Sequence, residues 1–419
     1  MFAIGRNHAL RRAFAVILSR VPTTSRLHLV TADEDHRVST LELFFDLVFV
    51  YAITQTTQLM ADHLSPLGIG QGMAMLTVLW WCWSGYVWLG NTIHVDQGIA
   101  RLALFGAMAV SFLVSLTIPE AFTDLPGGLD APLLFVGCYL AVRLLHLVAY
   151  LGAARHDPGL RKVLLRMFPG VLPSVALLTV ATFFSGWPQF GLWAVAMLWD
   201  YGNVFFTRAS EWRVNQPGHF AERYGLIVII ALGESIVAIG IGISALPMSW
   251  LVVGAATGGL ALAAGMWWTY FDVVAHVSEH KLTKAEGAER VKIATDSYTF
   301  MHLPLIAGIV LVALGLKKAL LYVADTEHHS ASEALHGVPI WALTGGLALY
   351  LFTLSALRRR NLGSWNHQRL ILAVLLLAAT PLLEHVPAAA LVAIVSVTVL
   401  ALIAFERNRR SKVMSGIAG

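Results

Sequence analysis

The sequence predicts an all-α, polytopic integral membrane protein, a helical bundle of about twelve transmembrane helices. Of its 419 residues, 57% are hydrophobic and only 13% are charged, which is about half the charged fraction of a typical soluble domain. A soluble fold with so little charge lacks the polar surface that faces water. The composition therefore excludes an ordinary cytosolic enzyme, a disordered chain and a nucleic-acid-binding protein, and it makes the lipid bilayer the expected surrounding.

Twelve apolar runs divide the chain, each close to the roughly 20 residues that a membrane-spanning helix requires. Their unbroken apolar character predicts helices and not the alternating strands of a membrane barrel. Short links containing Pro and Gly, such as 65–68 and 125–128, separate them. The predicted spans are 39–60, 69–91, 99–119, 132–152, 168–185, 189–207, 222–243, 249–274, 294–316, 338–357, 368–385 and 388–406.

The basic residues predict the orientation of these spans. All but three of the 29 Lys and Arg residues fall in the two tails or at alternate links; the exceptions are Arg143 in the fourth run and Lys317 and Lys318 on the opposite side. Because Lys and Arg are enriched on the cytoplasmic side, this bias predicts that both termini are cytoplasmic. An odd number of spans would break the alternation, so the bias also supports twelve.

The predicted organisation is two membrane halves of six helices each, 38–215 and 216–407, between basic cytoplasmic tails at 1–37 and 408–419. In the first tail, residues 13–19 resemble a short signal-peptide core but lack a good cleavage site. We therefore expect a basic interfacial helix or a loose tail at 8–20, with a signal peptide as the alternative.

A weak internal repeat relates the two halves. At an offset near 188, Asp46 aligns with Glu234, and the aromatic segment 80–83 aligns with 267–270. Six is an even number, so both halves enter the membrane from the same side. The pattern predicts a parallel 6+6 repeat, which some secondary transporters use; the alternative is chance matching of aromatic pairs in apolar helices.

Charged side chains inside the predicted spans are the candidate functional residues, because a charge in hydrocarbon costs several kcal/mol unless it is paired or hydrated. Glu42 is expected to cap the first helix through a capping box at 39–42. Asp46 lies one turn deeper on the same face, where the alternative to a functional role is a structural ion pair. Glu234 lies about 18 Å into its span at 1.5 Å per residue, near the midplane.

Three further candidates are Asp200 in the sixth run and Arg143 and His146, which share one face of the fourth. Arg143 is the expected partner of one of the acids, either as a static clamp or in a working role. Asp46, Asp200 and Glu234 against one guanidinium leave surplus negative charge, and burial favours a protonated carboxyl. The sequence therefore predicts a proton, a metal cation or a small organic cation as the ligand, in preference to an anion.

Other motifs carry less weight. Residues 276–280 match the H-x-x-E-H pattern of some zinc peptidases, but they cross the end of a span and have no evident third ligand. The sequence accordingly predicts no metal site and no cofactor. Cys82 and Cys138 lie in apolar runs and are expected to be small buried side chains. Asp272 is expected to be an interfacial charge at a helix end.

Three motifs resemble those of the bacterial low temperature requirement protein A family: RVSTLELFFDLVFV at 37–50, ERYGLIVIIALGES at 222–235 and WWTYFD at 267–272. The resemblance covers about 35–405 and implies a multi-pass protein of a bacterial inner membrane, associated with growth at low temperature. It implies no particular reaction. The charged positions that the resemblance singles out are Glu42, Asp46, Glu222, Arg223, Glu234 and Asp272.

The preferred functional hypothesis is a transporter or permease coupled to protons or cations through its intramembrane carboxylates. A membrane-embedded enzyme, with Asp46, Glu234 or residues 276–280 in acid–base roles, is the second hypothesis. The third is a non-catalytic membrane protein that supports growth at low temperature and whose buried charges are structural. Neither the substrate nor the oligomeric state follows from the sequence.

Overall fold

The computed structural model describes residues 38–418 apart from 94, 96–97, 207–211 and 245. The described part is a helical bundle without a β-strand, and an isolated β-bridge pairs Ala334 with Pro387. The predicted basic tail at 1–37, with its expected interfacial helix, lies outside the described residues.

The helices of the first half follow one another with short links. They are α2 (Thr40–Asp62), α3 (Pro66–Gly90), α4 (Gly98–Thr117), α5 (Ala131–Ala153), α6 (Pro158–Met167), α7 (Val171–Ala181) and α8 (Gly186–Phe206). The second half contains a π-helical segment, η4 (Ala294–Phe300), between two α-helices. Its α-helices are α9 (Pro217–Ile243), α10 (Trp250–Phe271), α11 (Val274–Lys284), α12 (Gly287–Ile293), α13 (His302–Ala324), α14 (Val338–Leu362), α15 (His367–Leu383) and α16 (Ala388–Ala418).

Each of the twelve predicted spans coincides with helix in the described residues, and the prediction of a polytopic helical bundle is confirmed. Nine helical segments of the described chain are long and apolar enough to cross a membrane. The other three are α3, α8 and α15. Helices α3 and α8 are long enough to span, at 25 and 21 residues, but Trp, Gln and Tyr residues make them less apolar; α15 has 17 residues.

Two spans differ from their predicted form. The predicted run 168–185 is the second part of a longer unit in which α6, a 3-10 turn and α7 follow one another. The predicted run 294–316 begins in the π-helical segment, and α13 continues to Ala324. Lys317 and Lys318, which the sequence placed in a link, are therefore in the last turns of a helix.

Helix starts follow the local sequence. Ser39, Ser65, Asp130, Ser249 and Asn366 are the N-cap residues of α2, α3, α5, α10 and α15, and each side chain accepts a hydrogen bond from an amide of the first turn. These caps satisfy amides that lack a partner within the helix. The helix limits are therefore set largely by residues that the sequence shows directly.

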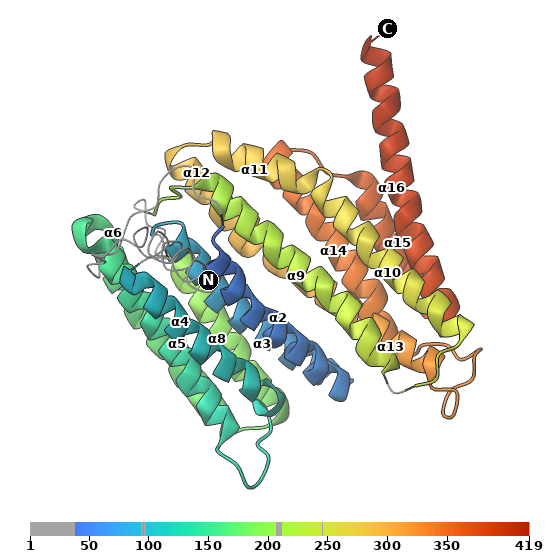
Figure 1. Ribbon diagram of the computed structural model, residues 1–419, viewed down its shortest axis with the longest axis horizontal. Helices are drawn as coiled ribbons and strands as arrows, with labels where there is room; N and C mark the ends of the chain where they lie inside the picture. Colours follow the sequence, from blue (N-terminus) through green and yellow to red (C-terminus); the bar gives the residue numbers. More distant parts are fainter. Residues whose placement is uncertain (1–37, 94, 96–97, 207–211, 245, 419) are drawn as a thin grey trace, which may run out of the picture.

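The two halves lie side by side, with α2 and α9 between them (Figure 1). In the first half, α2 packs on α3 and α4, α4 on α5, α3 on α8 and α5 on α7. In the second half, α9 packs on α10 and α13, α13 on α14, α10 on α16 and α14 on α15. Taken in chain order, the same pairs of helices meet in both halves. The halves contact each other where α2 lies against α9 and α13.

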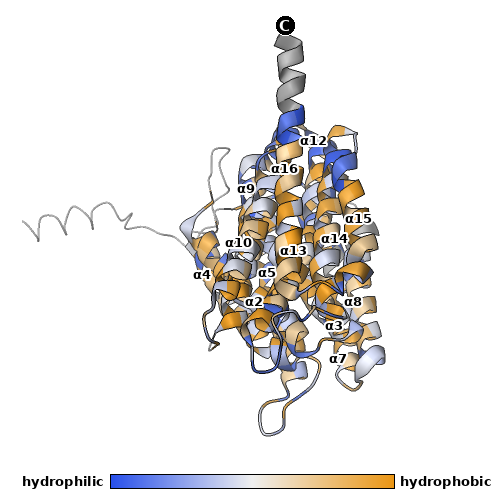
Figure 2. Cartoon of the chain, turned by 90° about the vertical axis from the view of Figure 1, so that its right-hand side faces the viewer, coloured by the Kyte–Doolittle hydropathy of each residue, from blue (hydrophilic) through white to orange (hydrophobic). Residues whose placement is uncertain are grey.

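The outer surface of the bundle is apolar. Figure 2 shows hydrophobic residues along most of each helix and hydrophilic ones near α12 and on α16 just before its grey end. Large apolar side chains are exposed on this surface, among them Leu102, Val148, Phe183, Leu198 and Val374. Exposure of such a large apolar surface to water is unfavourable, whereas lipid chains cover it without cost. The chain is a multi-pass membrane protein.

The closest helix contact is between α13 and α14. A Cβ atom at Gly346 would lie 2.7 Å from the Cβ atom of Leu311 and 2.8 Å from the carbonyl oxygen of Gly308. Small residues allow such approaches between membrane helices, where van der Waals packing replaces the hydrophobic effect. This pair forms the most deeply buried part of the second half.

Candidate functional site

A row of polar side chains runs along α2 at an angle to the helix axis. Glu42, Asp46, Thr54, Gln58 and Asp62 recur at multiples of four residues, and such positions form an inclined ridge on the surface of a helix. The partners of these side chains, described below, come mostly from α9 and α13. The row therefore lies at the contact between the two halves of the bundle.

At one end of the row, four side chains form the acid–arginine cluster: Glu42, Asp46, His219 and Arg223. Arg223 Nη1 lies 3.1 Å from Glu42 Oε1, and its Nη2 lies 2.6 Å from Asp46 Oδ1. His219 Nε2 lies 3.1 Å from both carboxylate oxygens of Glu42. All four residues are buried, with Asp46 1% and Arg223 2% exposed. One guanidinium thus joins two carboxylates on the neighbouring helix.

Aromatic side chains enclose this cluster. Trp83 Nε1 donates a hydrogen bond of 2.9 Å to Asp46 Oδ1, and the ring of Trp83 lies 6.0 Å from the guanidinium carbon of Arg223. Behind it lies Thr299 of the π-helical segment. Its carbonyl oxygen accepts a hydrogen bond of 2.8 Å from Trp80 Nε1, and its Oγ1 lies 3.1 Å from the Tyr224 hydroxyl. Single π-helical turns occur frequently at functional sites, and this one fixes the wall of the cluster.

Two polar atoms of the cluster form no hydrogen bond with the described residues around it. Asp46 Oδ2 and Arg223 Nε are buried and have no hydrogen-bond partner among the described residues. Two carboxylates against one guanidinium leave one surplus negative charge when His219 is neutral. A buried, uncompensated charge is costly. One proton, on His219 or on Asp46, makes the cluster neutral.

A second group, the Glu234 cluster, lies at the other end of the row. Thr54 Oγ1 donates to Glu234 Oε2 at 2.5 Å. Lys317 Nζ donates to Gln58 Oε1, and Gln58 Nε2 donates to Asp62 Oδ1 at 2.7 Å. Glu234 is 4% exposed and Lys317 8%. The direct partner of this deep carboxyl is the Thr54 hydroxyl, and Lys317 binds Gln58, one turn further along α2.

An apolar interval separates the two clusters. Asp46 and Thr54 are eight residues apart, about 12 Å along α2. Val50 interrupts the polar row between them, and Phe49 and Ile53 are buried beside it. Apolar side chains therefore separate the two clusters along α2.

Asp200 and Arg143 belong to a third group, inside the first half. Asp200 accepts hydrogen bonds from Tyr139 and from Ser174, the latter at 2.8 Å. The guanidinium carbon of Arg143 lies 5.9 Å from the ring of Tyr139 and 5.8 Å from that of Trp81. Tyr139 thus contacts both charged residues, and Asp200 is held by hydroxyl groups.

The prediction that Arg143 is the single deep basic residue is wrong. Helix α9 begins at Pro217, before the predicted start at 222, so Arg223 lies inside the helix and is buried. Arg223, and not Arg143, is the ionic partner of Asp46. Counting Arg223 and Lys317 among the cations and Glu42 among the acids reduces the predicted surplus from two negative charges to one. Arg369 is also buried, but its ion pair with Glu406 leaves this sum unchanged.

The structure places the four remaining predicted residues, Glu42, His146, Asp272 and Glu222, in different local environments. The capping box of Glu42 is confirmed: Ser39 N donates to Glu42 Oε2 at 2.9 Å. His146 Nε2 contacts the carbonyl oxygen of Gly85 at 2.9 Å, apart from the acids. Asp272 is the C-cap residue of α10, as its predicted helix-end position implies. Glu222 is exposed, and its Oε2 accepts from the Val38 amide at 3.3 Å.

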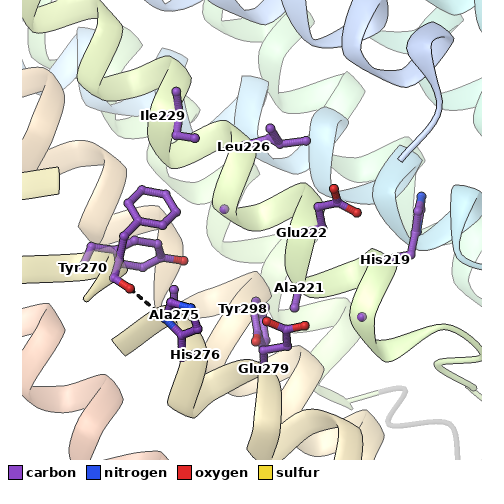
Figure 3. A pocket seen from close by; sticks show the side chains of 13 residues that line it. His219, Ala221, Glu222, Leu226, Ile229, Tyr270, Ala275, His276, Glu279 and Tyr298 are labelled. Atoms are coloured by element: carbon purple, nitrogen blue, oxygen red, sulfur yellow. Dashed lines mark hydrogen bonds between the residues drawn. The ribbon is translucent and has the colours of Figure 1, made fainter. Parts of the chain in front are cut away.

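A pocket of about 500 Å³ lies beside the acid–arginine cluster, between α9, α10, α11 and η4 (Figure 3). His219 lines it and so belongs to both the pocket and the cluster. Glu222, Glu279 and His276 also line it. His276 Nδ1 lies 2.8 Å from the carbonyl oxygen of Phe271. The described residues hold no group of three His, Cys, Asp or Glu side chains that is arranged for a metal ion.

Sequence reasoning did not single out His219 or Tyr298 as members of a site, and Glu279 entered it only as part of the 276–280 motif. A signal for His219 was present, because it lies four residues before Arg223 and therefore on the same face of α9. Tyr298 had no such signal, because its place in the pocket depends on how η4 packs against α9. The pocket is thus a product of helix packing.

Comparisons with known proteins agree with the fold. The model of the bacterial low temperature requirement A protein family (LtrA) matches residues 37–404, nearly the whole chain. The chain is also 28% identical over 329 residues to the uncharacterized protein RA0937 of Rhizobium meliloti (strain 1021), covering 73% of this chain and 75% of that protein. No solved structure matches the chain significantly.

Proposed function

The chain belongs to the bacterial low temperature requirement A protein family, and we propose that it is a proton-coupled secondary transporter for a cation. The observation that carries the proposal is the acid–arginine cluster at the contact of α2 and α9, with its surplus negative charge. We place it in a bacterial inner membrane with both termini in the cytoplasm, in accord with the distribution of Lys and Arg.

The proposed proton site is the acid–arginine cluster itself. A proton on His219 or on Asp46 neutralises the cluster, and its release restores a negative charge that holds Arg223 more tightly. Each step changes the attraction between α2 and α9, because the carboxylates are on one helix and the imidazole and guanidinium are on the other. Protonation is thereby linked to the contact between the two halves.

Glu234 is the proposed second carboxyl on the pathway. It lies beyond the apolar interval from Asp46, and its hydrogen bond from Thr54 holds it against α2. A cation that passes both carboxyls must cross that interval, so transport requires the halves to open at one end and then at the other. Alternating exposure of a central site is the general mechanism of secondary transporters.

The helix pairs support the division into two halves, 38–215 and 216–407, that this mechanism uses. In chain order, the first helix of each half packs on the second and third, the third on the fourth and the second on the sixth. Two units of like packing that meet at α2, α9 and α13 are suited to rock against each other. We propose that they form the parallel repeat that the sequence predicts.

A structural role for the buried charges is the second candidate. The observation that favours it is the double ion pair of Arg223, which binds Glu42 and Asp46 at the same time. In that case the cluster fastens α2 to α9, and the protein supports growth at low temperature without transport. Neutral substitutions would then lower the yield of folded protein and leave flux unchanged in the protein that folds.

Proton movement in liposomes tests the proposal. Purified protein is reconstituted with a pH-sensitive dye inside, and gradients of Na⁺, Mg²⁺ or tetraethylammonium are imposed in turn. We expect at least one gradient to move protons. Asp46→Asn and Glu234→Gln are expected to reduce this movement at least tenfold, whereas Glu327→Gln, at an exposed loop residue, leaves it unchanged. Proton movement under none of the three gradients, or wild-type rates in both buried variants, overturns the proposal.

A further inference from the structure

We propose that the pocket between α9, α10, α11 and η4 binds a small organic cation that carries an aromatic or alkyl group. Its lining includes two carboxylates, Glu222 from α9 and Glu279 from α11, and contains no Lys or Arg. Figure 3 shows these two residues projecting from different helices of the pocket. The pocket therefore presents negative charge from two sides and favours a positively charged ligand.

Apart from His219 and His276, the rest of the lining is apolar and aromatic. Leu226 and Ile229 come from α9, and Tyr270 and Phe271 come from α10. A volume of about 500 Å³ is within the usual range of ligand pockets, which are mainly apolar with a few polar groups. Aromatic faces attract organic cations through the ring quadrupole. An ammonium group attached to an aromatic ring fits both kinds of lining.

A buried hydroxyl supplies an independent sign of a ligand. Tyr298 lines the pocket and is 2% exposed, yet its hydroxyl has no hydrogen-bond partner among the described residues. Its ring stacks on His302 with centroids 5.2 Å apart, which fixes its direction. Leaving a buried polar group unbonded is costly, so such groups are expected to meet a ligand or water. A polar ligand in this pocket removes that cost.

The position of the pocket relates binding to the acid–arginine cluster. His219 lines the pocket and also contacts Glu42. A cation bound in the pocket therefore lies one side chain away from the acid–arginine cluster, and its charge opposes the protonated form of that cluster. As a substrate site, the pocket rests on the proposed function. As a binding site, it is measurable without any flux.

Calorimetry on the full-length protein in detergent tests the inference. The probe is benzyltrimethylammonium, and benzyl alcohol and benzenesulfonate are the neutral and anionic comparisons. We expect the cation to bind and the two comparisons not to bind. Glu222→Gln and Glu279→Gln are each expected to weaken binding about tenfold, and the double variant is expected to abolish it. Tyr298→Phe is expected to weaken binding several-fold.

Glu286→Gln is the matched control, because Glu286 is exposed at the neighbouring start of α12 and makes no side-chain cap. It removes the same charge near the pocket without altering its lining, and its binding should equal that of the wild type. Equal binding of benzyl alcohol, or wild-type affinity in the double variant, overturns the inference. Binding without proton movement retains this inference and removes the proposed function, and proton movement without binding does the reverse.

Discussion

Removing the guanidinium of Arg223 is the most direct test of the acid–arginine cluster. Arg223→Met keeps an unbranched side chain of similar length but leaves Glu42 and Asp46 buried without their cation. Breaking a buried ion pair from one side costs about 3–5 kcal/mol. Because the two ion-pair distances are 3.1 and 2.6 Å and Arg223 is 2% exposed, we expect the free energy of unfolding to fall by about that full amount.

The design isolates the charge from the packing. In a background carrying Glu42→Gln and Asp46→Asn, Arg223→Met should cost less than about 1 kcal/mol, because no orphaned carboxylate remains. Arg358→Met, at an exposed arginine near the end of α14, should change stability by no more than about 0.5 kcal/mol. The loss in the single variant should shrink as the pH falls, because protonation neutralises the orphaned acids.

Unfolding by SDS titration in mixed micelles, followed by circular dichroism, measures these differences. If Arg223→Met is as stable as the wild type in the native background, the cluster does not hold α2 against α9. If the loss is equally large in the background without the two acids, its origin is packing and not charge. Either result refutes the electrostatic account of this contact.

Two further predictions concern packing and pH. Gly346→Ala should destabilise the protein by about 1–3 kcal/mol through overpacking against α13, whereas Gly233→Ala, where an added Cβ meets nothing within 4 Å, should not destabilise it; equal losses in SDS titration would contradict the close contact. A hydrogen bond from His328 lowers the pKa of Asp325. Above the usual pKa of an aspartate, Asp325 is therefore ionised and this contact of the α13–α14 loop is formed. The contact is lost only as the pH falls through the lowered pKa. A spin label in the loop should therefore become mobile only in strong acid, and in His328→Ala it should be mobile at every pH; equal mobility in the two proteins would rule this contact out.

The sequence by itself determined the helices and most of their limits. A helix in lipid satisfies its backbone groups internally, so a long apolar run implies a helix whatever surrounds it. Caps such as Ser39 and Asp130 then fix the first turns locally. The capping role of Glu42 and the helix-end position of Asp272 were predictable for the same reason, because both depend on residues close in the chain.

Only the tertiary structure decided which charges meet. Arg223 and Asp46 are 177 residues apart, and their contact depends on how α2 and α9 are rotated and how deep each lies. The helices are apolar nearly all round, so the sequence carries little information about which face is inward. The sequence predicted that α9 begins at 222, with Arg223 at the membrane edge. The helix begins at Pro217, and packing against α2 buries the Arg223 side chain. Pairing across helices is a property of packing, and hydrophobicity alone does not encode it.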